Sequence, residues 1–395
     1  MSSRFPLPLL LAGLVAIAAC KDSTEPGTDD GPTAATVSGV VKAAVTKLPI
    51  AGATVTIGGQ HTETGANGQF ELTGVATGAL TIRCEHPRYQ TQQASLTVPA
   101  GGITRDFELA VQEIYEFGSN AIYVPADVGT VRAVIIALGG PTATGFVTGG
   151  PLTPKVLDPI VEQSQQTLGS LLRTLARSRH VALLGSSTTS MSNNASSDQH
   201  LLAALDSAAT LSGHPELASA PVVMLGMSGG GPEASGLAAR NPARTVGVFV
   251  RVPDALSLLT APEALAVPAF VLQAGDDVAA TNAATRQVFV TNRKNGGRWA
   301  LIAEPGRQHF GSSPIGNTMT LDWITAVLDL RLPAAAGGEL LSLAQSSGWL
   351  GSQASLEIAS WDDYVGDRTA ASWLPTEATA REWQALGTPS GSSTE

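Results

Sequence analysis

Residues 222–230 read Val-Val-Met-Leu-Gly-Met-Ser-Gly-Gly, and the architecture of the larger part of the chain follows from them. The four apolar residues predict a short buried strand, and residues 232–241 predict a helix directly after the glycines. Between the two lies a match to the G-x-S-x-G pattern, in which a strained turn from a strand to a helix exposes a serine. Ser228 is therefore a candidate nucleophile.

Apolar runs similar to 222–225 recur along the chain, separated by longer segments with a helical pattern. They lie at residues 131–138, 181–184, 246–250, 269–272 and 299–302. Short buried strands that alternate with helices are typical of a mostly parallel sheet with helices on both faces. We therefore expect an α/β domain over residues 112–336.

The general base is the next requirement, because a serine hydroxyl is a poor nucleophile until a base removes its proton. Where a turn of this kind carries a catalytic serine, an acid and then a histidine follow it in the chain. His309 is the one histidine of six that lies C-terminal to Ser228, in a loop after the run 299–302. It is the predicted base.

The acid that orients the histidine should leave the end of the preceding strand, where the sequence reads Gly275-Asp276-Asp277-Val278. Asp277 fits the usual placement a few residues beyond the strand better than Asp276. We favour Asp277 and keep Asp276 as the alternative acid. Weaker alternatives are Asp254, Glu263 and Glu304.

The oxyanion that forms during acyl transfer needs hydrogen-bond donors. The backbone N–H of Gly229, the residue after the nucleophile, is one candidate. A second should come from the loop that follows the run 131–138, which reads Gly139-Gly140-Pro141. Pro141 has no N–H, so we expect Gly140 or Gly139 to donate, with Thr142 as a less favoured substitute.

Residues 36–111 contain short alternating or β-branched runs that glycines interrupt at close intervals. The runs lie at 37–41, 53–57, 70–72, 80–84 and 95–98, and none has a helical period. This pattern predicts an all-β sandwich. Asn67-Gly68, whose residues tolerate positive φ, predicts a tight hairpin. Cys84 alternates with polar neighbours and is expected to be a buried small side chain.

Residues 1–19 have the character of an export signal. Arg4 supplies a positive charge, and the apolar segment after it is shorter than the ~20 residues that a membrane-spanning helix requires. Residues 20–35 are dominated by Asp, Thr, Gly and Pro, which predicts a flexible tether. The ending Val15-Ala16-Ile17-Ala18-Ala19-Cys20 resembles the bacterial lipobox. That resemblance implies that the signal peptide is removed and that Cys20 is lipidated.

The charge balance excludes one class of partner. The chain carries 23 Lys and Arg against 33 Asp and Glu, and the net charge of -10 is spread without basic blocks. Because nucleic-acid-binding surfaces are basic, we expect neither DNA nor RNA as a partner. His180, His200 and His214 lack the spacing of metal ligands, so we expect no metal site and no cofactor. Two cysteines cannot form a disulfide framework.

Residues 337–395 form a C-terminal extension with four of the six tryptophans, namely Trp349, Trp361, Trp373 and Trp383. Indole rings bury a large apolar area, so we expect them to pack against the α/β domain. Stacking of one or two rings on a sugar or an aromatic acyl group is the alternative.

The N-terminal strands resemble a known family. Ser38-Gly39-Val40-Val41, residues 49–57 and Gly68-Gln69-Phe70 occur in the order typical of the carboxypeptidase regulatory-like domain. The resemblance implies a transthyretin-like β-sandwich without catalytic residues of its own, and thus a spacer or docking module. Carbohydrate binding is the alternative, although residues 36–111 contain no Trp that could stack on a sugar.

Residues 114–332 resemble the α/β-hydrolase family, in particular secreted esterases of the feruloyl esterase and polyhydroxybutyrate depolymerase type. Two features depart from the family. Leu138 stands where many members have a His before the Gly, and the acid loop is one residue shorter than the common Gly-x-x-Asp. The resemblance implies a serine hydrolase that cleaves small or polymeric carboxylic esters through an acyl-enzyme.

The complete expectation is an exported enzyme that a lipid at Cys20 anchors to the outer membrane or the cell surface. A serine peptidase of the same fold is the first alternative. The second is a binding or adhesion lipoprotein with a degenerate hydrolase domain.

Overall fold

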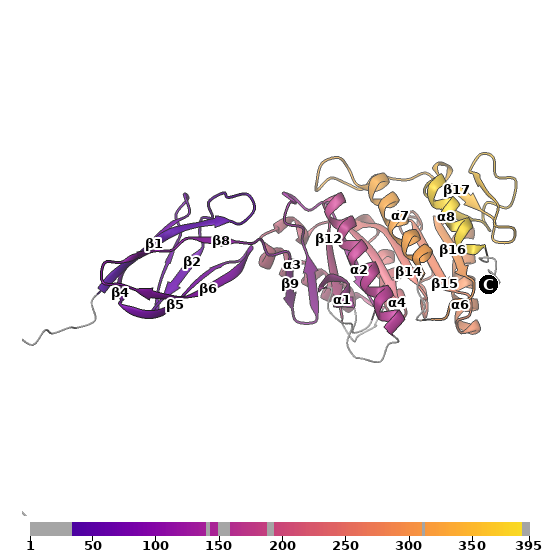
Figure 1. Ribbon diagram of the computed structural model, residues 1–395. Coiled ribbons are helices and arrows are strands. Elements are labelled where there is room, and N and C mark those ends of the chain that lie inside the picture. The colour runs from indigo at the N-terminus through magenta and orange to yellow at the C-terminus, as the bar shows by residue number, and fades with distance from the viewer. Residues whose placement is uncertain (1–33, 140–142, 149–158, 188–192, 310–312, 389–395) are drawn as a thin grey trace, which may run out of the picture.

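The computed structural model describes residues 34–139, 143–148, 159–187, 193–309 and 313–388, and Figure 1 shows a small all-β part followed by a larger α/β part. The predicted signal peptide, Cys20 and the predicted tether up to residue 33 lie outside the described residues. The first strand begins at Ala34, slightly before the predicted start of the sandwich. Within the described ranges, no helix has the length and apolar character needed to cross a membrane.

The N-terminal part is a sandwich of two four-stranded sheets, which confirms the all-β prediction. One sheet contains β1 (Ala34–Ala43), β4 (Gln69–Ala76), β7 (Ile103–Thr104) and β8 (Phe107–Leu109). The other has the order β3-β2-β5-β6, formed by β2 (Thr54–Ile57), β3 (Gln60–Glu63), β5 (Gly78–His86) and β6 (Tyr89–Val98). Inward-facing residues such as Val37, Val55 and Ile82 are fully buried between the sheets.

Cys84 lies in this core and has no exposed surface. Burial, with a smaller contribution from Glu85, raises the pKa of the Cys84 thiol to about 11. The thiol therefore stays protonated and packs as a small apolar side chain, as predicted.

The turn at Asn67-Gly68 differs from the prediction. Gly68 has the expected positive φ of 75°, and its N–H donates to the carbonyl oxygen of Gly65 at 2.8 Å. However, β3 and β4 lie in different sheets, so this turn leads from one layer of the sandwich to the other and is not a hairpin. A Cβ at residue 68 would lie 2.5 Å from the carbonyl oxygen of Val41, which explains the glycine.

The α/β part is built on an eight-stranded sheet with the order β16-β15-β14-β13-β11-β12-β10-β9. The strands from β16 to β12 in this order are parallel, while β10 runs antiparallel to β12 and β9 antiparallel to β10. Their bounds are β9 (Ile114–Phe117), β10 (Asn120–Tyr123), β11 (Val134–Leu138), β12 (Ala182–Ser186), β13 (Val222–Met227), β14 (Thr245–Arg251), β15 (Ala269–Ala274) and β16 (Trp299–Glu304). The mostly parallel sheet is present as predicted, and the sequence analysis missed only its two antiparallel strands.

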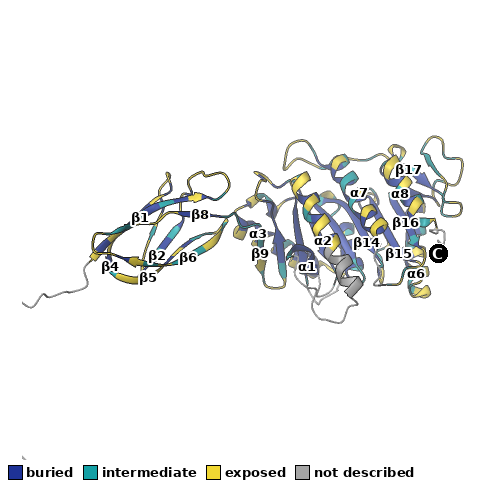
Figure 2. Ribbon diagram, viewed as in Figure 1, coloured by how far each residue is buried: buried dark blue, intermediate teal, exposed yellow. Residues whose placement is uncertain are grey.

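Helices cover both faces of this sheet (Figure 2). Side chains such as Ile136 and Met224 pack against α3 (Ala195–Ser212), α4 (Gly230–Arg240), α5 (Pro262–Leu265) and α6 (Ala279–Lys294). Their neighbours, such as Ile135 and Val223, pack against α1 (Ala143–Thr148), α2 (Pro159–Arg179), α7 (Pro314–Arg331) and α8 (Glu377–Gly387). Burial on both faces explains why the central strands are continuous apolar runs.

The C-terminal extension adds a small antiparallel sheet and α8 beside β16. The sheet has the order β18-β17-β19, with β17 (Trp349–Gly351), β18 (Ile358–Ser360) and β19 (Ser372–Leu374). Trp373 and Trp383 are buried, and their indole N–H groups donate to the carbonyl oxygens of Gln345 and Leu301, each at 2.8 Å. These two rings therefore pack as predicted and present no face to a sugar.

The outer edge of β16 is closed by this extension. The Leu301 N–H donates to Ser372 Oγ at 2.9 Å, and the Leu301 carbonyl oxygen accepts from Ser372, Trp383 and Gln353. Side chains thus satisfy backbone groups that an open sheet edge would leave unpaired. The extension is part of the α/β body and not a separate tail.

Candidate active site

Ser228 occupies the turn between β13 and α4, as the sequence predicts. Its φ of 49° lies in the left-handed region, where a side chain is strained. The Ser228 N–H donates to the carbonyl oxygen of Arg251 at 3.0 Å, and the Ser228 carbonyl oxygen accepts from Gly231 N at 2.9 Å. The start of α4 and the end of β14 thus hold the strained serine in place.

The glycines around Ser228 are required by packing. A Cβ on Gly226 would lie 2.7 Å from the carbonyl oxygen of Gly230, and one on Gly139 would lie 3.0 Å from the Cβ of Met227. The end of β11 and the turn at Ser228 therefore lie directly side by side.

His309 connects the serine to the acid. Its Nε2 lies 2.8 Å from Ser228 Oγ, and its Nδ1 lies 2.7 Å from Asp277 Oδ2. In the tautomer that satisfies both contacts, Nδ1–H donates to the carboxylate and the Nε2 lone pair accepts from the serine hydroxyl. The imidazole is thus oriented to take a proton from Ser228.

Asp277, and not Asp276, is the carboxylate that contacts the imidazole. The Asp277 side chain is only 6% exposed, and its second oxygen accepts from the Val278 N–H at 2.7 Å. Asp276 is exposed, and its N–H donates to the carbonyl oxygen of Arg307 at 2.8 Å. That backbone bond ties the acid loop to the loop that carries His309.

The three weaker candidates for the acid occupy other positions. Glu304 pairs with Arg307 at 2.8 Å, and Glu263 lies in the first turn of α5. Asp254 lies beside the serine, with its Oδ1 at 3.5 Å from Ser228 Oγ. This contact could not be predicted from the sequence, because it depends on how the loop after β14 folds over the turn at Ser228.

The predicted oxyanion donors are only partly described. Gly229 is the N-cap of α4, with φ −57° and ψ −16°, and backbone N–H groups at the start of a helix have no partner within it. Gly140 and Thr142 lie outside the described residues. Gly139 lies next to Met227, so the loop that would supply the second donor begins beside Ser228.

The sequence analysis missed a buried arginine at the end of β14, next to the turn at Ser228. Arg251 is 5% exposed, and its guanidinium donates to Asn317 Oδ1 at 2.7 Å. Burial lowers its pKa to about 10, against the opposing effect of Glu304, so it remains a cation at neutral pH. An arginine at the end of an otherwise apolar strand was the available signal.

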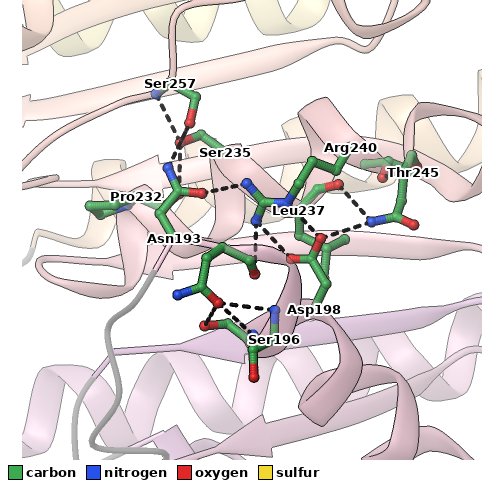
Figure 3. A network of polar contacts seen from close by, with 12 residues as sticks. Asn193, Ser196, Asp198, Pro232, Ser235, Leu237, Arg240, Thr245 and Ser257 are labelled. Carbon is green, nitrogen blue, oxygen red and sulfur yellow. Dashed lines mark hydrogen bonds and ion pairs between the residues drawn. The ribbon is translucent and has the colours of Figure 1, made fainter.

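A network of polar side chains fixes the far end of α4 (Figure 3). The Arg240 guanidinium donates to both carboxylate oxygens of Asp198, at 2.7 and 2.8 Å, and to Asn193 Oδ1 at 2.8 Å. Asn193 Nδ2 donates to Ser257 Oγ at 3.0 Å, and the Ser257 N–H donates to Ser235 Oγ at 3.2 Å. The network therefore connects α3, α4 and the loop after β14.

The structure offers no candidate for a metal centre in the ranges it describes. Among those residues, no group of three or more His, Cys, Asp or Glu side chains is placed to hold an ion. His214 instead contacts Glu216 at 2.9 Å, in the short helix η2 (Pro215–Ala218).

Comparison with known proteins identifies the N-terminal part. Residues 36–111 match the model of the carboxypeptidase regulatory-like domain, which confirms that resemblance for the sandwich alone. No curated protein matches the chain.

Two similar solved structures each overlap with a minor part of this chain. A candidate carbohydrate-binding protein from Bacteroides uniformis is 16% identical, with a TM-score of 0.18, over 24% of this chain and 52% of its own. A type II cohesin–X-dockerin complex from Acetivibrio cellulolyticus is 29% identical, with a TM-score of 0.17, over 20% of this chain and 56% of that one. The chain thus spans about half the length of these two structures.

Proposed function

We propose that this protein is a serine hydrolase that cleaves carboxylic esters through an acyl-enzyme. One observation carries the proposal: Ser228 Oγ, the His309 imidazole and the Asp277 carboxylate form a continuous chain of contacts at 2.8 and 2.7 Å. The three groups come from three separate loops, which meet at the carboxyl ends of β13, β15 and β16. A nucleophile, a base and a carboxylate that orients the base together form the catalytic triad of acyl-transfer enzymes.

The architecture supports assignment of the larger domain to the α/β-hydrolase family. Its nucleophile lies on a strained turn between a parallel strand and a helix, and the acid and the histidine follow in that order. Helices cover both faces of the sheet, so the loops at the carboxyl ends of its strands form the rim on which a substrate would bind.

The proposed reaction begins when Ser228 Oγ attacks the ester carbonyl carbon and its proton passes to His309 Nε2. The carbonyl oxygen becomes an oxyanion, which the Gly229 N–H stabilises together with a donor from the loop that starts at Gly139. The bond to the alcohol oxygen then breaks, and that oxygen takes the proton from Nε2. In the second half a water molecule gives a proton to His309 and attacks the acyl carbon. The bond from that carbon to Ser228 Oγ then breaks, and Oγ takes the proton from Nε2, which releases the acid and restores Ser228. Asp277 stabilises the imidazolium in both halves.

The direct test uses purified soluble protein that begins after Cys20, a panel of short-chain aryl esters and an active-site phosphonate. We expect the wild type to hydrolyse esters and to be labelled once, and Ser228→Ala to lose labelling and about 10⁶-fold in kcat. Ser207→Ala, on the exposed side of α3, is the matched control and should behave as the wild type. A wild type that neither hydrolyses nor labels would favour a non-catalytic binding protein, and preferential cleavage of peptide substrates would favour the peptidase.

We further propose that the enzyme is exported and held at a membrane by a lipid on Cys20, with the sandwich as a spacer. The lipobox resemblance supports the anchor, and the domain match supports the spacer, because that family contributes no catalytic residues. In cells that express the full chain, Cys20→Ala should move the protein out of the membrane fraction. Unchanged partitioning of this variant would refute the anchor.

A further inference from the structure

Two acceptor groups lie near the hydroxyl of Ser228, which has one hydrogen to give. His309 Nε2 is at 2.8 Å and Asp254 Oδ1 is at 3.5 Å, so the hydrogen goes to the nearer imidazole. The Asp254 carboxylate is thus placed beside the nucleophile without receiving its hydrogen. Asp254 is exposed, and none of the ion pairs between described residues includes it.

The loop that carries Asp254 is held in this position by strain and packing. Val252 has a φ of 43°, which a β-branched residue adopts only when its surroundings enforce it. Pro253 is buried against α4, where a Cβ on Gly231 would lie 2.6 Å from the proline Cβ. The Ser257 N–H bond to Ser235 ties the far end of the same loop to α4. Strain of this kind collects at functional sites.

A negative charge here has a consequence for the reaction. The acyl transfer proposed above develops an oxyanion within a few ångströms of Ser228 Oγ, and a free carboxylate nearby opposes that charge. This electrostatic repulsion is cancelled when the substrate carries a positive group that pairs with the Asp254 carboxylate. The geometry therefore favours cationic substrates.

The short distance between Asp254 and Ser228 limits where the positive group can sit. In a reactive complex the carbonyl carbon lies about 3 to 3.5 Å from the attacking oxygen. A substituent on the neighbouring α-carbon is two bonds from the carbonyl carbon, so it can reach a carboxylate that is itself 3.5 Å from Oγ. A protonated amine at that position donates strong hydrogen bonds to carboxylate oxygens.

We propose that Asp254 is the specificity-determining residue, and that the preferred acyl group carries a protonated amine on the carbon next to the scissile carbonyl. This inference rests on the proposed function and adds the substrate class to it. The expected substrates are esters of α-amino acids.

The test compares wild type with Asp254→Asn, which keeps the shape of the side chain and removes its charge. The substrates are the 4-nitrophenyl esters of 2-aminobutanoic, 2-hydroxybutanoic and butanoic acid, corrected for spontaneous hydrolysis. We expect the ratio of kcat/KM for the amino ester to kcat/KM for the butanoate to fall by about 10- to 100-fold in Asp254→Asn. Asp206→Asn, which removes an exposed carboxylate on α3, should keep the wild-type ratio.

Each other outcome overturns the inference in a recognisable way. A parallel fall for all three esters would assign Asp254 a general structural role, and an unchanged ratio would remove it from recognition. An equal fall for the hydroxy and amino esters would show that hydrogen bonding, and not charge, is recognised. A wild type that hydrolyses none of the esters would refute the proposed function and this inference with it, whereas turnover of butanoate with an unchanged ratio refutes the inference alone.

Discussion

The main chain of Gly230 lies directly against Leu138, so that a Cβ on residue 230 would be 2.5 Å from the Leu138 carbonyl oxygen. This contact joins the first turn of α4 to the end of β11. It sets the distance between the turn at Ser228 and the loop that begins at Gly139. Both proposed oxyanion donors therefore depend on this pair of residues.

Gly230→Ala should damage the enzyme through this contact. The added methyl group forces α4 and β11 apart, which we expect to lower the free energy of unfolding by about 1–3 kcal/mol. A displacement near 1 Å at the site should also lower kcat/KM for aryl esters by about 100-fold. Urea denaturation and ester hydrolysis measure the two effects.

Gly129→Ala is the matched control, because a Cβ at residue 129 meets no heavy atom within 4 Å. It should change neither the free energy of unfolding nor kcat/KM for aryl esters. If Gly230→Ala were as stable and as active as this control, the close contact with Leu138 would not control the site.

The acid of the proposed triad can be assigned by two adjacent substitutions. Asp277→Asn removes the acceptor that fixes the Nδ1–H tautomer of His309, so kcat should fall by about 10⁴-fold. Asp276→Asn changes an exposed side chain one residue away and should stay within about threefold of wild type. The reverse ranking of the two kcat values would overturn the assignment.

Local sequence information is enough to predict some residues of the candidate site but not others. Ser228 and His309 could be predicted because a local motif marks the serine and chain order leaves one histidine. The choice between Asp276 and Asp277 could not be made with the same security, because neighbouring residues share the same local context. Only the fold shows which carboxylate faces the imidazole.

The features that could not be predicted from the sequence either lack a local pattern or depend on tertiary contacts. Strands β9 and β10 are short and have mixed polarity, so no clear period marks them. The contact of Asp254 with Ser228 and the burial of Arg251 arise where segments distant in sequence meet. The turn at Gly68 was placed correctly, but its local residues could not show that the flanking strands belong to different sheets.

The hydrogen bond of Ser372 to the outer edge of β16 should stabilise the fold. Ser372→Ala removes the acceptor of the buried Leu301 N–H, and an unpaired buried donor should lower the free energy of unfolding by about 1–3 kcal/mol. Urea denaturation followed by tryptophan fluorescence measures the change. Ser347→Ala, whose exposed hydroxyl donates to the Ala344 carbonyl oxygen, is the control. Equal stabilities of the two variants would show that the hydrogen bond of Ser372 to the edge of β16 does not stabilise the fold.

Glu233, in the first turn of α4, gives the protein a stability that depends on pH. Its side chain is buried, and burial, followed by the negative charge of Asp198, raises its pKa from 4.5 to about 7, against the opposing charge of Arg240. Between about pH 4.5 and 7 the folded protein therefore binds the proton more tightly than the unfolded chain. The contribution of this group to stability is complete below pH 4.5, declines as the pH rises through that window, and is lost above about pH 7.

Glu233→Gln should remove this dependence, because the amide has nearly the same shape and does not ionise. Relative to wild type, the variant should gain on the order of 3 kcal/mol in free energy of unfolding between pH 4.5 and pH 8. Urea denaturation at several pH values measures the difference. Glu116→Gln removes an exposed carboxylate on β9, and the free energy of unfolding of this variant should differ from that of wild type by the same amount at every pH. If Glu233→Gln also differed from wild type by a constant amount, Glu233 would ionise equally in the folded and unfolded chains, and its burial at the start of α4 would impose no electrostatic penalty.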